Sequence, residues 1–159
     1  MSQLGDRLAI EDLLVRYCTC VDEVDVERLV VEVFAEDGTD NHGLGIWRGR
    51  DELRAGFAAL LDRFAGTMHQ VANFDISIDG DTATSRCYVT AWHWLDRPEP
   101  STPNGPPVDF LAIGAYHDHL RRTPDGWRIT RRTMRPVGYS VNAFGTLPPF
   151  MVPIARTAH

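Results

Sequence analysis

The sequence predicts an α+β fold in which three helices precede a run of mostly antiparallel strands. Two observations lead to this prediction. Apolar residues recur every three or four positions up to about residue 64, and they alternate with polar residues from His69 onward. Helices that come before the strands, instead of alternating with them, are typical of α+β domains. No repeat or linker divides the 159 residues, so residues 1–159 are predicted to form one domain.

Three segments have the helical period. The first, residues 3–21, has an apolar stripe on one side and charged residues on the other. The stripe consists of Leu4, Leu8, Ile10, Leu13, Leu14, Tyr17, Cys18 and Val21. A second, short helix is predicted from about Val26 to Phe34 and is closed by Gly38, because glycine readily adopts the left-handed conformation that ends helices. A third helix is predicted over residues 50–64 and ends at Gly66.

Strand patterns and turn signals fill most of the rest. Residues 38–47 have three glycines and no helical period, so they are predicted to be a bent strand or a loop. Asp-Gly pairs at 79–80 and 125–126 predict two tight hairpin turns. The predicted strands are 69–78, 82–95, 110–122 and 127–137, and residues 96–108, with five prolines, are predicted to be a loop.

Composition excludes several classes of protein. Hydrophobic residues make up 43% of the chain and charged residues 24%, which is typical of soluble globular domains. The net charge of −6 argues against nucleic-acid binding, which needs a positive surface. The apolar runs are too short to span a membrane. Three cysteines without framework spacing predict reduced thiols, so we expect a cytoplasmic protein.

One predicted strand carries a narrow face that suits a cavity or a closely packed helix. Its odd positions are Ala83, Ser85, Cys87, Val89, Ala91, His93 and Leu95, and strand alternation places them together. From this strand alone, a cavity and close packing are equally good interpretations. If Ala115 and His117 of the next strand share this face, then His93 and His117 look into one space, with His69 nearby.

Several short motifs resemble the SnoaL-like branch of the nuclear transport factor 2-like (NTF2-like) superfamily. They are Asp6-Arg7-Leu8-Ala9-Ile10-Glu11-Asp12-Leu13-Leu14, Trp47-x-Gly49-x-Asp51, His69-x-x-x-Asn73, Gly114-x-Tyr116-x-Asp118 and Asp125-Gly126-Trp127. The resemblance covers roughly residues 4–137. It implies a cone-shaped fold with three helices packed on a curved sheet that encloses a pocket, and a homodimer or homotrimer.

Within this branch, the chain resembles scytalone dehydratase and bile-acid dehydratase in its candidate functional residues. That similarity implies that Asp22 holds His69 and that these two residues are catalytic. It also places Tyr17 and His93 as residues that bind a small organic substrate. An arginine of bile-acid dehydratase falls near Arg132, and the alignment leaves open which of the arginines at 131, 132 and 135 faces the pocket.

Two further positions are weaker candidates for substrate binding. Asn41 falls near one of the tyrosines with which scytalone dehydratase holds a water molecule, and the other falls near Val21. That tyrosine pair is therefore missing here. His117 falls near an asparagine contact of the same enzyme.

The expected activity is a dehydration assisted by Asp22 and His69 as an acid–base pair, since an unperturbed imidazole titrates near neutral pH. An isomerase, a polyketide (aldol) cyclase and a noncatalytic binding module remain alternatives, because the fold hosts all of them. No motif implies a metal or a cofactor. The apolar, proline-punctuated tail, residues 140–159, is predicted to cover the mouth of the pocket.

Overall fold

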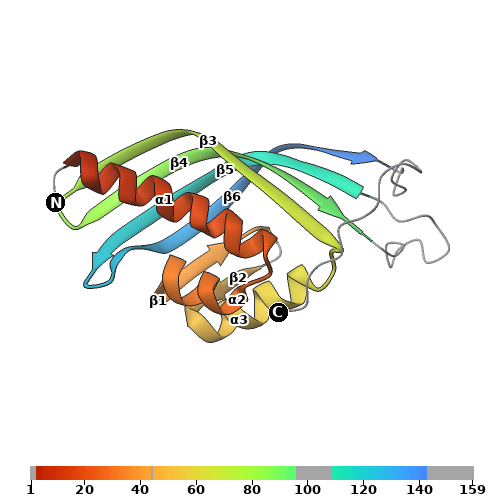
Figure 1. Cartoon of the computed structure of the whole chain (residues 1–159), viewed down its shortest axis with the longest axis horizontal. Coiled ribbons are helices and arrows are strands. Elements are labelled where there is room, and N and C mark those ends of the chain that lie inside the picture. The colour runs from red at the N-terminus through yellow and green to blue at the C-terminus, as the bar shows by residue number, and fades with distance from the viewer. Residues whose placement is uncertain (1–2, 44, 96–108, 143–159) are drawn as a thin grey trace.

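The computed structural model describes residues 3–43, 45–95 and 109–142 (Figure 1). The helical part consists of α1 (Gln3–Asp22), α2 (Val26–Arg28) with a π-helical turn η1 (Leu29–Val33) directly after it, and α3 (Gly49–Leu61). The strands are β1 (Phe34–Asn41), β2 (Ile46–Arg48), β3 (Gly66–Asp79), β4 (Thr82–Trp94), β5 (Asp109–Thr123) and β6 (Gly126–Asn142). Two short strands therefore lie between the second and third helices, and the four long strands follow.

The six strands form one open sheet in the order β2-β1-β6-β5-β4-β3. β1 runs parallel to β6, and all other neighbours in the sheet are antiparallel. In Figure 1, α1 crosses one face of the long strands, and α2 and α3 lie beside β1 and β2. Three helices on a mostly antiparallel sheet are the fold class that the sequence predicts, so this prediction is confirmed.

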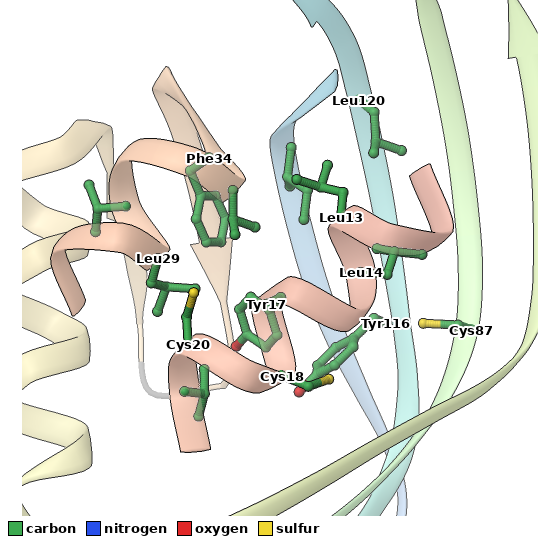
Figure 2. Packing of buried hydrophobic residues seen from close by; sticks show 14 of the residues in the cluster. Leu13, Leu14, Tyr17, Cys18, Cys20, Leu29, Phe34, Cys87, Tyr116 and Leu120 are labelled. Atoms are coloured by element: carbon green, nitrogen blue, oxygen red, sulfur yellow. The ribbon is translucent and has the colours of Figure 1, made fainter. Parts of the chain in front are cut away.

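The core lies between α1 and the inner face of the sheet. Figure 2 shows Leu14 and Tyr17 of α1 facing Cys87 of β4 and Tyr116 of β5. The odd positions of β4 from Ala83 to Ala91 are all buried, as strand alternation predicts. Ala83, Cys87, Val89 and Ala91 belong to the same buried cluster as Leu14 and Tyr17 of α1.

The first turns of α1 differ from the predicted stripe. Leu4 and Leu8 are 67% and 53% exposed, whereas Asp6 is buried. The Asp6 carboxylate accepts hydrogen bonds from the indole N–H of Trp127, at 3.2 Å, and from Arg122. The bond from Arg122 is the main reason why the pKa of Asp6 falls to about 2. The first turns of α1 therefore point Asp6 toward the β5–β6 hairpin, where its carboxylate accepts hydrogen bonds from Arg122 and Trp127.

The second helix is confirmed to within one residue, since the helical segment stops at Val33, but the expectation that Gly38 closes it is wrong because β1 already starts at Phe34. Gly38 lies within β1. A Cβ atom on this residue would lie 2.8 Å from the carbonyl oxygen of Ala35 and 3.0 Å from that of Ile129 in β6. The glycine therefore permits the close approach of β1 and β6 and does not end a helix.

The other boundaries shift by a few residues. Gly66 begins β3, while α3 already ends at Leu61. Both hairpin turns are confirmed, with Gly80 at φ +58° and Gly126 at φ +102°. β6 extends beyond its predicted end because its backbone pairs with β5 as far as Asn142. The predicted loop at 96–108 and the tail from residue 143 lie outside the described residues.

Candidate acid–base site

The fold brings the end of α1 against the start of β3, and this contact joins Asp22 to His69. The Nδ1 atom of His69 lies 2.7 Å from Oδ1 of Asp22. The other carboxylate oxygen, Oδ2, accepts the backbone N–H of His69 at 2.9 Å, and the Thr67 hydroxyl donates to Oδ1 at 2.9 Å. A carboxylate only accepts hydrogen bonds, so the proton belongs on Nδ1 and Nε2 is the basic nitrogen.

The surroundings keep Asp22 ionised. The side chain of His69 is 7% exposed and that of Asp22 is 25% exposed. Burial alone would raise the pKa of Asp22, but hydrogen bonds from the ring and backbone of His69 and from Thr67 outweigh it and lower the pKa. A lowered carboxyl pKa stabilises the folded state above the unfolded value of 3.8, and this contribution is lost as the pH falls through the folded value.

His93 lies beside this pair on β4. Its ring centroid is 5.5 Å from that of His69, and it stacks on Phe110 at 4.2 Å. Burial, followed by the nearby charge of His69, lowers the pKa of His93 to about 4. His93 is therefore neutral at neutral pH. Its buried Nδ1 atom has no hydrogen-bond partner within the described part of the chain.

Tyr17 belongs to a neighbouring polar group inside the core. Its ring lies 4.0 Å from the guanidinium of Arg132, which also stacks on Tyr116 at 4.1 Å. Arg132 is the inward-facing residue of the three candidate arginines, since Arg131 and Arg135 are exposed. Two hydrogen bonds, of 2.8 and 2.7 Å, join it to Asp118.

Asn41 and His117 lie away from the dyad. The side chain of Asn41 accepts the backbone N–H of Gly43 at 2.9 Å and so closes a local turn. The expectation that His117 shares the face of His93 is wrong, because β4 and β5 pair with Tyr116 opposite the inward-facing Cys87. This register is uninterrupted along the two strands and places His117 opposite Arg86, so His117 lies on the outer face.

Sequence reasoning missed His42, Asp40 and Asp118. His42 follows the end of β1 and contacts Tyr17. It lies one position after Asn41, which the resemblance had indicated as a candidate. Asp40 and Asp118 are fully or almost fully buried. For Asp118 the alternation of β5 carried a signal, because an acidic residue at a core parity requires a partner.

Other chemistries find little support among the described residues. No three His, Cys, Asp or Glu side chains in that part of the chain are grouped as a metal site. Cys18, Cys20 and Cys87 are free and buried, and burial raises the pKa of Cys18 to about 12 and those of the other two to about 11, so they remain thiols. No helix in the described ranges is long and apolar enough to cross a membrane.

Two surface hollows lie away from the dyad. One, of about 490 Å³, includes Ser77, Thr84 and His119 in its lining, and a smaller one includes Arg86 and His117. Neither lining contains Asp22 or His69. The pocket beside the dyad therefore stays a prediction.

An open, mostly antiparallel sheet covered by three helices defines an NTF2-like α+β fold. The chain belongs to the SnoaL-like domain family, whose model matches residues 2–133. It is 35% identical over 136 residues to the uncharacterized protein Rv2910c of Mycobacterium tuberculosis H37Rv. The aligned region covers 83% of this chain and 86% of that protein.

Solved structures from Novosphingobium aromaticivorans share the fold. A candidate aromatic ring hydroxylase superposes with a TM-score of 0.77 at 28% identity and covers 91% of this chain and 99% of its own. A candidate scytalone dehydratase superposes with a TM-score of 0.75 at 24% identity and covers 86% of this chain and 87% of its own. The fold of this chain is thus one that enzymes acting on small organic molecules use.

Proposed function

We propose that this protein is a cofactor-independent dehydratase that acts on a hydroxylated cyclic ketone, a polyketide or a steroid-like molecule. The contact between Asp22 and His69 supports this proposal most directly. It supplies a buried imidazole with an oriented proton on Nδ1 and a basic Nε2. The ionised carboxylate behind the ring stabilises the imidazolium that forms when Nε2 takes a proton.

The reaction needs one base, one acid and one hydrogen-bond donor for the developing enolate. His69 Nε2 removes the proton next to the substrate carbonyl, and the electron pair of that C–H bond forms the enolate. The enolate then expels the β-hydroxyl group as its C–O bond breaks. The imidazolium returns its proton to that oxygen, so the products are an unsaturated ketone and one water molecule. His69 and Asp22 end the cycle unchanged.

His93 is suited to binding the substrate. Because its pKa is about 4, the ring is neutral and offers one donor and one acceptor nitrogen at working pH. The neutral ring lies against His69, where a second positive charge would oppose protonation of the base. We assign the substrate carbonyl or the departing hydroxyl to His93, with Tyr17 as a further candidate.

Product mass tests the proposal. The protein is incubated with a panel of β-hydroxy cyclic ketones, aromatic polyketides and hydroxysteroid ketones, and the products are analysed by mass spectrometry. A dehydratase removes one water from the substrate. An isomerase or aldol cyclase uses the same enolate but conserves mass. Binding without turnover across the panel would favour the noncatalytic alternative and contradict the proposal.

We further propose that the chain forms a homodimer or homotrimer through the outer face of the sheet. Large apolar side chains are exposed there, including Met68 at 41%, Tyr88 at 45% and Ile113 at 40%. Contiguous apolar surface of this kind marks interaction sites. Sedimentation velocity is expected to give two or three times the monomer mass, and Ile113→Glu is expected to shift the protein toward the monomer. A monomeric wild type at high micromolar concentration would contradict this expectation.

A further inference from the structure

Thr67 and His69 of β3 together supply three hydrogen-bond donors to the Asp22 carboxylate. The Thr67 hydroxyl donates to Oδ1 at 2.9 Å, and the ring Nδ1 of His69 lies 2.7 Å from the same oxygen. The backbone N–H of His69 donates to the other oxygen, Oδ2, at 2.9 Å. Oδ1 therefore shares its negative charge between the ring of His69 and a neutral hydroxyl.

Strand geometry places Thr67 beside the acid–base pair. Residues 67 and 69 are two positions apart on β3, so their side chains point to the same face of the sheet. In the neighbouring strand β4, Thr67 is paired with His93 and His69 is paired with Ala91. The threonine side chain thus lies on the face that carries both imidazoles, where Asp22 reaches it from the end of α1.

The hydrogen bond from Thr67 does more than hold the carboxylate in place. The ring and the backbone of His69 already bind one carboxylate oxygen each, and these two bonds fix the plane of the Asp22 side chain. Thr67 adds a second donor to Oδ1, the oxygen that faces the ring. A hydrogen bond to the charged form stabilises that charge and weakens the affinity of the oxygen for another proton.

We propose that Thr67 is a positioning residue of the dehydratase proposed above, and that its hydroxyl moderates the pull of Asp22 on the proton-transferring ring of His69. This inference rests on the proposed function, in which His69 is the base. A hydroxyl that donates to Oδ1 withdraws negative charge from the carboxylate that stabilises the imidazolium. The ring therefore stays in its basic form to a lower pH and returns its proton to the departing hydroxyl more readily.

The other titratable neighbours of this pair are neutral near pH 7. His93 faces the ring of His69 from β4, and burial, followed by the charge of His69, lowers the pKa of His93 to about 4. Cys18 of α1 lies within electrostatic range of Asp22, and burial raises the pKa of its thiol to about 12. Among these neighbours, all within the described ranges, Asp22 carries the charge. The hydrogen bonds that it accepts therefore decide how strongly it acts on the ring.

Replacing Thr67 with Val tests the inference without any substrate. Valine keeps the β-branched shape that suits a strand but has no hydroxyl. In an NMR titration of the free protein with ¹⁵N-labelled histidine, we expect the pH midpoint of the His69 ring to rise by about half a unit or more. Thr67→Ser keeps the hydroxyl and is expected to restore the wild-type midpoint. The control is Thr84→Val, which alters an exposed threonine of β4 and is expected to leave the midpoint unchanged.

The pH dependence of kcat/KM supplies a second readout. On the substrate that the product analysis identifies, the acidic limb of the Thr67→Val profile is expected to move to higher pH by the same amount as the NMR midpoint. Activity well below the midpoint then falls about threefold, because half a pH unit changes the fraction of basic imidazole by that factor. The plateau at high pH is retained. A merely structural role for Thr67 would lower the plateau and leave the midpoint where it is.

The outcomes separate this inference from the function on which it rests. A raised NMR midpoint without turnover of any substrate in the panel would support the action of Thr67 on Asp22 and contradict the dehydratase. A midpoint in Thr67→Val that is unchanged or lower overturns the inference, whatever the activity. A Thr67→Ser variant that titrates like Thr67→Val overturns it as well. If the valine variant does not fold, Thr67→Ala takes its place, and its midpoint is expected to rise in the same direction.

Discussion

Replacing His69 with Asn is expected to lower kcat/KM by about 10²–10⁴-fold on the substrate that the product analysis identifies. The side chain of asparagine is of similar reach and can donate to Asp22, but its amide cannot accept a proton at neutral pH. The loss of activity therefore measures proton transfer by the His69 ring separately from the hydrogen bond that this side chain makes to Asp22. It corresponds to about 3–5 kcal/mol of transition-state stabilisation. Initial rates give kcat/KM, and thermal unfolding shows that the variant is folded.

A matched control and a second variant sharpen this test. His119→Asn removes an exposed histidine whose ring contacts Arg131, and it is expected to keep full activity. Asp22→Asn is expected to lose activity as well, because the new amide group must point a donor at the backbone N–H or the ring N–H of His69. A His69→Asn loss of less than tenfold would remove the dyad from the mechanism.

Replacing Asp118 with Asn is expected to lower the free energy of unfolding by about 3–5 kcal/mol. The side chains of Asp118 and Arg132 are both fully buried and joined by two hydrogen bonds. The asparagine keeps the volume but removes the charge, so the guanidinium of Arg132 is left buried without compensation. Urea unfolding followed by circular dichroism measures the difference.

Another ion pair of nearly the same length provides the control. Asp37 lies 2.8 Å from Arg121, but its side chain is 68% exposed and that of Arg121 is 47% exposed. Water screens this pair, so Asp37→Asn is expected to cost only about 0–1 kcal/mol. If both variants lose the same small amount of unfolding free energy, burial does not make the Asp118–Arg132 pair more stabilising than the exposed pair. In that case the inner arginine has another compensating contact.

Local patterns were enough to predict the main elements. The helical period of α1, the alternation of β4 and the Asp-Gly turns are properties of short segments, and the structure confirms each of them. The helix predicted from about Val26 to Phe34 ends at Val33, but Gly38 does not close it, because a long-range contact decides where β1 begins. Phe34 pairs with Ile129 of β6, which is far away in the sequence.

The same distinction applies to the candidate site. Asp22 and His69 could be predicted because they fall on matching positions of a family motif, and the structure brings their side chains together. The outward placement of His117 depends on the register between β4 and β5, which pairs it with Arg86 and which no local pattern reveals. Asp40 and His42 were missed because a short strand between helices has too few residues for its alternation to be recognised.

The backbone hydrogen bond from His69 to Asp22 positions the strand independently of the side chain that transfers the proton. Its donor belongs to the main chain, so any amino acid except proline at this position retains it. The Asp22 carboxylate therefore anchors the first long strand to the end of the first helix whichever side chain occupies position 69. A substitution of His69 by any residue except proline changes the reacting side chain but keeps this backbone hydrogen bond. A substitution of Asp22 removes both the backbone hydrogen bond and the electrostatic partner of the ring.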